Sequence, residues 1–322
     1  MTEHLDKALE DLKLPDHPAR LFDPIRYTLN AGGKRFRPYL TMLGCELAGG
    51  DPMRAIPAAV SVELLHNFTL IHDDIMDDAE TRRGQQSVYK KWGTNDAILS
   101  GDYMFALAIE QLDRYRNDHE LDKERFGLLY HTLLTGVRTV CEGQSRDMEF
   151  EKRHDVDIQQ YLQMIGQKTA ALLKTSIELG TLVANAESQL TLNAGDMAYQ
   201  AGLAFQIQDD VLDATADAEK FGKKIGGDIR EQKKTCLYVI ASQRLNEQGR
   251  KELAEIYEQN QVSEEQVQNV INIFHETGAI REARNLLESY YRNSIERLEE
   301  FDKIEAREKI KTLLDQLRNR EK

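Results

Sequence analysis

Proline is missing from most of this chain of 322 residues. All six prolines lie within the first 57 residues, and none occurs from Ala58 to Lys322. A proline inside a helix costs about 3 kcal/mol. Its absence therefore permits a succession of long helices over the rest of the sequence.

Cysteine is scarce as well, and long apolar runs are absent. The three cysteines, Cys45, Cys141 and Cys236, lie far apart and form no CxxC pair. This spacing favours free thiols in a reducing compartment over a disulfide framework or a zinc site. No apolar run approaches the length of a membrane span. We expect a cytoplasmic protein with no integral membrane association.

Positive charge is the minority charge. The chain has 42 Lys and Arg against 55 Asp and Glu, which gives a formal net charge of −13. Such a protein repels nucleic acid, so we expect no nucleic-acid partner. An anionic substrate would need local basic residues or bound metal cations.

The sequence predicts an all-α protein. Strand-like alternation is rare, whereas a helical period is widespread. The predicted helices include three strongly apolar ones, over 59–77, 157–184 and 193–213, and a charge-rich helix or pair from about Glu276. No linker or low-complexity segment interrupts the chain. We therefore expect one all-α domain over residues 1–322, built as a helical bundle.

An acidic motif occurs twice, each time at the end of an apolar helix. The two copies are Asp73, Asp74 and Asp77, and Asp209, Asp210 and Asp213. In each copy the first and last acids stand four residues apart, on neighbouring turns of one helix face. Basic residues follow both copies. A single copy would most simply be a solvated helix end, but a duplicated one favours a shared function.

Clustered carboxylates repel one another unless a cation lies between them. Oxygen ligands without His or Cys indicate a hard ion, and Mg²⁺ binds through one or two carboxylates plus substrate phosphates. The nearby arginines and lysines would bind phosphate oxygens. The two motifs therefore predict a diphosphate held through Mg²⁺.

A third cluster, GGKRFRP at residues 32–38, places Lys34, Arg35 and Arg37 beside two glycines and ahead of a helix that starts near Pro38. Glycine lets the backbone approach an anion, and the three bases can surround one. By itself a basic loop before a helix is common. Beside the acidic motifs it predicts a second anion site.

With these motifs the sequence resembles the trans-isoprenyl diphosphate synthases, or polyprenyl synthetases, from about Leu29 to Arg320. The family's motifs occur in order as GGKRFRP, ELLHNFTLIHDDIMDDAETRRG, GQKTAAL, FQIQDDVLD and GKKIGGDIREQKKT. The resemblance implies an isoprenoid-synthase-type bundle with a central active-site cavity. It also implies head-to-tail condensation of an allylic diphosphate with isopentenyl diphosphate, and a homodimer.

The resemblance also implies roles for individual residues. Asp73, Asp77 and Asp209 would carry most of the Mg²⁺ coordination. Asp74, Asp210 and Asp213 would support it through water or hydrogen bonds. The residues implied for the allylic diphosphate are Arg82, Lys168, Thr169, Gln206, Lys223 and Lys233. Of these, Thr169 and Gln206 would direct oxygen dipoles at the developing cation.

The isopentenyl diphosphate site is implied at Lys34, Arg37, His66, Arg83 and Phe205, with Phe205 packed on the carbon skeleton. A lone buried His66 could equally be a hydrogen-bonded core histidine, and Thr169 and Gln206 could simply satisfy neighbouring helices. Arg35, Lys224 and Lys234 are expected to support the site from behind or to face solvent. The segment TCLY, residues 235–238, departs from the family's usual Thr-Leu-Pro without losing a ligand.

Product length is predicted from Phe68 and Thr69, just upstream of the first motif. In the family the fifth position before this motif often forms the floor of the cavity that holds the growing tail. A ring with a small neighbour suggests geranylgeranyl diphosphate, C20. A farnesyl (C15) or longer product, a class I terpene cyclase, and a regulatory subunit of a two-component synthase remain alternatives. Alternatively, Phe68 faces a neighbouring helix and the floor lies elsewhere.

Overall fold

The computed structural model describes residues 1–215, 225–259 and 261–318. The chain forms two compact units, each described by itself. Unit 1 comprises residues 1–137, 175–195 and 301–310, and unit 2 comprises residues 138–174, 196–300 and the segment from 311 onward.

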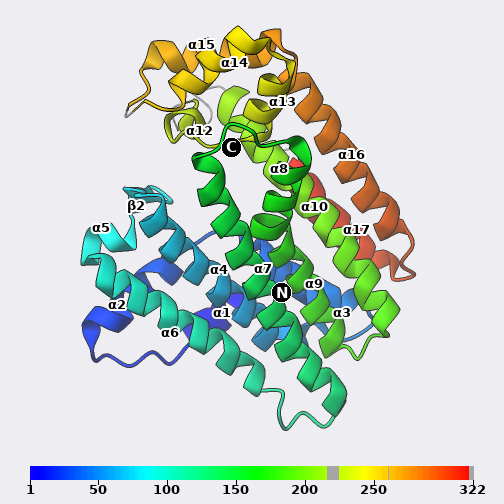
Figure 1. Cartoon of the computed structure of the whole chain (residues 1–322). Helices are drawn as coiled ribbons and strands as arrows, with labels where there is room; N and C mark the ends of the chain where they lie inside the picture. Colours follow the sequence, from blue (N-terminus) through cyan, green and yellow to red (C-terminus); the bar gives the residue numbers. More distant parts are fainter. Residues whose placement is uncertain (216–224, 260, 319–322) are drawn as a thin grey trace. The chain divides into compact units, whose positions relative to one another are not determined.

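Unit 1 holds the N-terminal helices (Figure 1). They are α1 (Thr2–Glu10), α2 (Ala19–Asn30), α3 (Phe36–Leu47), the 3-10 helix η1 (Pro52–Ala55), α4 (Ile56–Met76), α5 (Val88–Trp92) and α6 (Thr94–Asp113). Parts of α7 (Lys123–Glu151), α9 (Ala171–Val183), α10 (Ser188–Thr215) and α17 (Ile304–Arg318) complete it.

Helix α4 confirms the helix predicted over 59–77. It is apolar almost all round, so it is buried between neighbours rather than lying at the surface. Its most extensive packing is against α6. Gly101 of α6 permits this approach, because a Cβ at that position would lie 2.3 Å from Nε2 of His72.

A short hairpin, not predicted from the sequence, follows α4. Strand β1 (Thr81–Arg82) pairs antiparallel with β2 (Gln85–Gln86). The two residues of its turn, Arg83 and Gly84, have φ of 53° and 75°. Positive φ at both positions is typical of a type I′ turn, whose twist suits a two-residue hairpin. The hairpin thus places Arg82 in its first strand and Arg83 in its turn, shortly after the first acidic motif.

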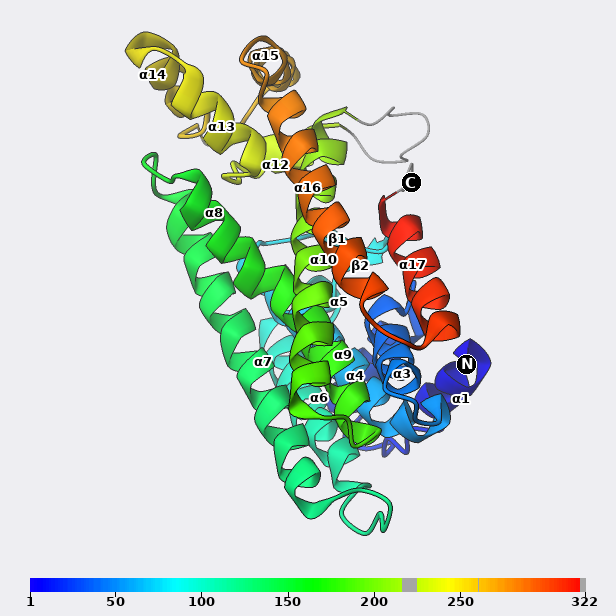
Figure 2. The same ribbon diagram turned by 90° about the vertical axis from the view of Figure 1, so that its right-hand side faces the viewer.

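Unit 2 holds the second acidic motif and most of the C-terminal half. Its remaining helices are α8 (Ile158–Ile165), the π-helical turn η2 (Gly166–Ala170), α12 (Gly227–Arg230), α13 (Cys236–Arg244), α14 (Glu247–Ile256), α15 (Glu264–Glu276) and α16 (Ala279–Glu299). Its core gathers apolar side chains of α8, α10, α13, α14, α15 and α16. Helix α16 runs beside α10 (Figures 1 and 2), where Ser294 Oγ donates a hydrogen bond to Met197 O at 3.0 Å.

The helix predicted over 157–184 is confirmed, with one local change. Residues 158–183 are helical throughout, but Gly166–Ala170 form a π-helical turn. Such turns are rare and frequently occur at functional sites. Two glycines allow close packing here. A Cβ on Gly143 would lie 2.3 Å from Lys168 N, and one on Gly166 would lie 2.0 Å from the hydroxyl of Tyr199.

The all-α prediction is confirmed for the described residues. The helix predicted over 193–213 is α10, and the charge-rich end forms a pair, α16 and α17. Among the described helices none is both long and apolar enough to cross a membrane. That all 322 residues form a single domain remains a prediction.

Candidate active site

The first acidic motif occupies the last turn of α4. Asp77 ends the helix, and its N–H donates to Asp73 O at 2.8 Å. Asp73 and Asp77 are partly exposed, whereas Asp74 is buried. Carboxylates at the C-terminus of a helix lie at the negative end of its dipole. A cation must therefore compensate them, either a basic side chain or a metal ion.

Arg82 supplies one such cation. It donates to Asp74 Oδ1 from Nε at 2.8 Å and from Nη2 at 2.5 Å. Asp74 is only 2% exposed. Burial raises the pKa of Asp74, and the adjacent guanidinium opposes this rise. Asp74 is thus held by Arg82, while Asp73 and Asp77 stand one turn apart on the more open side.

The segment GGKRFRP, residues 32–38, is held against α4 through Arg35 and Arg37. Arg35, with φ of 46°, forms an ion pair with the buried Glu63, and its Nη2 donates to Leu29 O at 2.8 Å. Arg83 Nη1 donates to Gly32 O. Arg35 is therefore buried, with a side chain 11% exposed, and it supports the segment from behind. Lys34 remains exposed.

His66 lies against Arg37 on the same side of α4. Its Nε2 is 3.3 Å from Arg37 Nη1. Burial, together with Arg37, Arg83, Arg82 and Arg35, holds the pKa of His66 well below its usual value. The ring is neutral at pH 7, and because Arg37 can only donate, Nε2 accepts and Nδ1 carries the hydrogen. Towards an anion His66 would be a neutral hydrogen-bond donor, not a second charge.

The two residues predicted to set product length lie on α4 beside this motif. Phe68 is half-buried, and its ring packs against Phe105 of α6 with centroids 5.5 Å apart, and edge-on to His72 at 4.8 Å. The hydroxyl of Thr69 donates to His66 O at 2.8 Å. Phe68 therefore faces the neighbouring helix α6. Phe105 extends the aromatic surface that begins at Phe68.

A polar cavity in unit 2 gathers the residues predicted around the second motif. Its volume is about 470 Å³, and its lining combines acids, lysines and neutral polar groups. These are Asp147, Tyr161, Met164, Ile165, Lys168, Thr169, Gln206, Asp210, Asp228, Lys233, Lys234 and Thr235. Four predicted allylic-site residues, Lys168, Thr169, Gln206 and Lys233, thus share one cavity. Lys223 lies outside the described residues.

Two of the three lysines that line this cavity, Lys168 and Lys233, are held by acids. Lys168 Nζ lies 2.5 Å from Asp147 Oδ2, and Lys233 Nζ lies 2.7 Å from Glu231 Oε2. Asp147 was not predicted, because one acid among several near the C-terminal end of α7 has no local signal. Its role is visible only once α7 and the π-helical turn are adjacent.

The acids of the second motif differ in their surroundings. Asp213 accepts hydrogen bonds from Gly227 N at 3.1 Å and Asp228 N at 3.0 Å, so it anchors the start of α12. Asp210 is 4% exposed and accepts from Tyr161 and from Cys236 N. Asp209 is partly exposed. Asp210 and Asp213, the two acids of this motif predicted to have supporting roles, thus both hold neighbouring backbone groups.

Lys234 is buried, 4% exposed, and does not face solvent. Its Nζ lies 4.6 Å from the ring centroids of both Tyr238 and Tyr257, and has no hydrogen-bond partner among the residues that the structure describes. Burial lowers the pKa of Lys234 from 10.5 to about 8.

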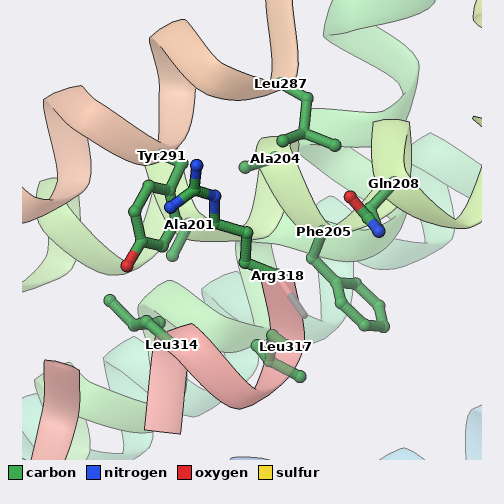
Figure 3. A pocket seen from close by; sticks show the side chains of 9 residues that line it. All are labelled: Ala201, Ala204, Phe205, Gln208, Leu287, Tyr291, Leu314, Leu317 and Arg318. Atoms are coloured by element: carbon green, nitrogen blue, oxygen red, sulfur yellow. The ribbon is translucent and has the colours of Figure 1, made fainter. Parts of the chain in front are cut away.

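Phe205 lines a separate, apolar pocket of unit 2, shown in Figure 3. The pocket lies between α10, α16 and α17, and its lining comprises Ala201, Ala204, Phe205, Gln208, Leu287, Tyr291, Leu314, Leu317 and Arg318. The guanidinium of Arg318 covers the ring of Tyr291 at 4.7 Å. Phe205 thus has C-terminal residues beside it, whereas Gln206 lines the polar cavity.

The donors near the first motif suit a hard dication. Asp73 and Asp77 offer carboxylate oxygens one turn apart, the ligand type that Mg²⁺ prefers. Over residues 1–215, 225–259 and 261–318, no three His, Cys, Asp or Glu side chains converge as a ready-made metal cage. The residues present fit an ion that takes a few carboxylate oxygens, and Asp73 and Asp77 would hold it.

Comparison with known proteins identifies the class. The polyprenyl synthetase family model matches residues 18–274. A short chain isoprenyl diphosphate synthase from Methanothermobacter thermautotrophicus is 38% identical over 319 residues, covering 99% of this chain and 95% of that protein. The chain belongs to the polyprenyl synthetase family. The predicted prenyltransferase activity is thereby confirmed.

Solved structures agree with this assignment. Geranylgeranyl pyrophosphate synthetase from Pyrococcus horikoshii matches with a TM-score of 0.92 and 35% identity, covering 99% of this chain and 96% of that chain. A polyprenyl synthase from Caulobacter crescentus, complexed with calcium and isoprenyl diphosphate, matches with a TM-score of 0.89 and 26% identity, covering 100% and 95%. The predicted isoprenoid-synthase-type helical fold is confirmed.

Proposed function

We propose that this enzyme condenses isopentenyl diphosphate with an allylic diphosphate, head to tail, in a Mg²⁺-dependent reaction. The observation that carries the proposal is that basic side chains lie beside an acid of each motif. In unit 1, Arg82 is bonded to Asp74. In unit 2, Lys168 and Lys233 line one cavity with Asp210. Carboxylates with adjacent bases suit a substrate that carries a diphosphate and its metal ions.

In this proposal Asp73, Asp77 and Asp209 coordinate Mg²⁺, and Asp74, Asp210 and Asp213 support them. When bound, Mg²⁺ supplies charge neutralisation of the leaving diphosphate. Arg82, Lys168 and Lys233 bind that diphosphate, and Lys223 is assigned to it from the sequence. The ion pair between Lys168 and Asp147, which holds the lysine in the polar cavity, supports its assignment to the allylic diphosphate.

Isopentenyl diphosphate is assigned to Lys34, Arg37, His66 and Arg83, with Phe205 against its carbon skeleton. The ion pair of Arg35 with Glu63 supports the assignment of Lys34, Arg37, His66 and Arg83, because it holds the segment in which Arg37 lies beside His66. Thr169 and Gln206 direct oxygen lone pairs at the cation left when the allylic C–O bond breaks. The proton lost after coupling goes to the released diphosphate, so no protein base is assigned.

We propose geranylgeranyl diphosphate, C20, as the main product. The name of the Pyrococcus horikoshii neighbour supports this length. The ring of Phe68 packs on Phe105 of α6, so its role as the floor of the tail cavity stays a prediction. Farnesyl diphosphate and longer chains are the alternatives that product analysis separates.

The test is incubation of the purified protein with Mg²⁺, isopentenyl diphosphate and labelled allylic primers. Condensation that stops in excess EDTA and returns with Mg²⁺ is expected, and Asp73→Ala or Asp209→Ala should each lower kcat by orders of magnitude. Full turnover in EDTA would refute the metal assignment. A cyclised hydrocarbon product without elongation would identify a terpene cyclase. A lack of turnover when the chain is assayed by itself would indicate a regulatory subunit.

We also propose a homodimer that works in the cytoplasm. Two neighbouring apolar side chains of α6, Ile98 and Leu99, are 40% and 58% exposed, and Leu134 of α7 is 39% exposed. Exposed apolar side chains of this kind are typical of protein interfaces. Light scattering should give twice the chain mass, and Leu99→Glu should shift it to the monomer. A wild-type monomer at micromolar concentration would contradict the proposal.

A further inference from the structure

A chain of hydrogen bonds runs along the wall of the polar cavity in unit 2. The hydroxyl of Tyr161, on α8, donates to Asp210 Oδ2 at 2.6 Å. The other oxygen of Asp210 accepts from Gln206 Nε2 at 3.1 Å. The amide oxygen of Gln206 in turn accepts from the hydroxyl of Thr169 at 2.8 Å. Four side chains from α8, α10 and the π-helical turn are thus joined, and the donors on both sides point toward Asp210.

The inner end of this chain is rigid. Tyr161 is 1% exposed and Asp210 is 4% exposed. Asp210 Oδ2 also accepts the backbone N–H of Cys236 at 2.9 Å, at the first turn of α13. A buried carboxylate with several donors has little freedom to rotate. Among the bonds to Asp210 from Tyr161, Gln206 and the Cys236 backbone, that from Tyr161 is the shortest, and it comes from α8.

The carboxylate of Asp210 determines which way the hydrogen bonds of Gln206 and Thr169 point. Gln206 and Asp210 stand four residues apart on α10, so they share a helix face. An ionised carboxylate only accepts, so Gln206 must turn its NH₂ toward Asp210. Its amide oxygen then points away, and it too can only accept. The hydroxyl hydrogen of Thr169 is therefore committed to Gln206, which leaves the oxygen lone pairs of Thr169 for the cavity.

We propose that Tyr161 is a positioning residue for the ionisation step: it holds Asp210, and through Asp210 it keeps the oxygens of Gln206 and Thr169 oriented toward the allylic carbon. In that step the allylic C–O bond breaks, its electron pair leaves on the diphosphate, and positive charge develops on carbon. Oxygen dipoles fixed in advance stabilise that charge without reorganisation. The inference rests on the proposed roles of Thr169 and Gln206, and Tyr161 itself touches no substrate.

The experiment compares Tyr161→Phe with a matched control, Tyr115→Phe. Tyr115 is also buried, and its hydroxyl donates to Arg54 O at 2.7 Å within unit 1. We expect Tyr161→Phe to lower kcat about tenfold, less than the loss of a direct oxyanion donor, with both KM values within about twofold. The control should leave kcat unchanged. Fluorinated allylic primers, which destabilise the cation, should slow the Tyr161 variant more than the wild type.

A double-mutant cycle tests whether Tyr161 acts through Gln206. In the Gln206→Leu background, Tyr161→Phe should cost nothing further, because the side chain it orients is gone. Multiplying effects, an unchanged kcat in Tyr161→Phe, or an equal loss in Tyr115→Phe would each overturn the proposal. If Tyr161→Phe does not fold, a ring-fluorinated tyrosine at position 161 keeps the shape and changes only the strength of the hydroxyl as a donor. In that variant kcat should shift, and an unchanged kcat would overturn the proposal.

The wild-type assay keeps this inference separate from the proposed function. A wild type that elongates primers, combined with a fully active Tyr161→Phe variant, refutes only the positioning role. A wild type without turnover refutes the proposed function itself.

Discussion

Arg82 donates two hydrogen bonds to one oxygen of Asp74, at 2.8 and 2.5 Å. The carboxylate is buried at the end of a helix, while the guanidinium side chain is 38% exposed. The two residues are eight apart in sequence, and the short connection between α4 and β1 brings Arg82 back to Asp74. This pair fixes the acidic end of α4 to the segment that supplies Arg83.

We expect Arg82→Leu to destabilise the protein, because it leaves a buried carboxylate without its cation. The cost should be about 2–3 kcal/mol, reduced from the fully buried case by the exposure of Arg82. Asp74→Asn should lower the loss caused by Arg82→Leu, and a double-mutant cycle in urea measures this coupling. The exposed pair Lys90–Asp78, 3.1 Å apart, is the control. Lys90→Leu should cost much less than Arg82→Leu, because an exposed pair is screened by solvent, and equal costs for both pairs would contradict the prediction.

The two diphosphate sites should separate kinetically. Lys34→Ala or Arg37→Ala should raise KM for isopentenyl diphosphate about tenfold or more, the loss of one charged hydrogen bond, with little change for the allylic primer. Lys168→Ala should do the reverse or lower kcat. Initial rates with each substrate varied in turn measure this split. Lys251→Ala, an exposed lysine of α14, is the control. Equal weakening of both substrates by both classes of variant would show that the bases are wrongly divided.

Lys234 should make stability depend on alkaline pH. The unfolded chain keeps this lysine protonated up to its ordinary pKa of 10.5, whereas in the folded protein burial lowers that pKa to about 8. Between these values the unfolded state binds more protons, so stability rises with pH across this window. The gain is about 3 kcal/mol at most. Below pH 8 the full cost of the buried charge is present.

Lys234→Met removes this charge at similar volume. The variant should be more stable than the wild type at pH 7, and the difference should shrink as the pH rises from 8 to 10.5. Urea unfolding at several pH values measures the difference, with Lys251→Met as an exposed control. A constant difference over this range would mean that Lys234 does not titrate as described.

Product length should respond to Phe68. Phe68→Ala removes the ring that packs on Phe105, which opens space along α4 and should shift the products to chains longer than C20. Chromatography after exhaustive elongation resolves the products. Phe126→Ala, which breaks an unrelated aromatic contact with Tyr130 on α7, should leave the products unchanged. Normal activity with an unaltered product distribution in Phe68→Ala would remove Phe68 from this role and place the floor elsewhere.

The sequence by itself determined the helices and the family. Helix α4 follows from a local pattern, since its apolar residues and the absence of proline after Pro57 in its first turn leave few other structures available. The duplicated acidic motif and GGKRFRP are also local, so their chemistry could be predicted without neighbours. The β1–β2 hairpin could not, because two-residue strands have too few residues to show a period.

Only the tertiary structure decided which charged side chains are paired or buried, and against which partners. The sequence left open whether Arg35 and Lys234 support the site from behind or face solvent, whereas in the structure Arg35 pairs with Glu63 and Lys234 lies against two tyrosine rings. Asp147 and Tyr161 gave no signal, because each acquires its role from a partner far along the chain, Lys168 and Asp210. Periodicity reports which side of an element is buried. It does not report what that side meets, since partners are chosen by packing between elements distant in sequence.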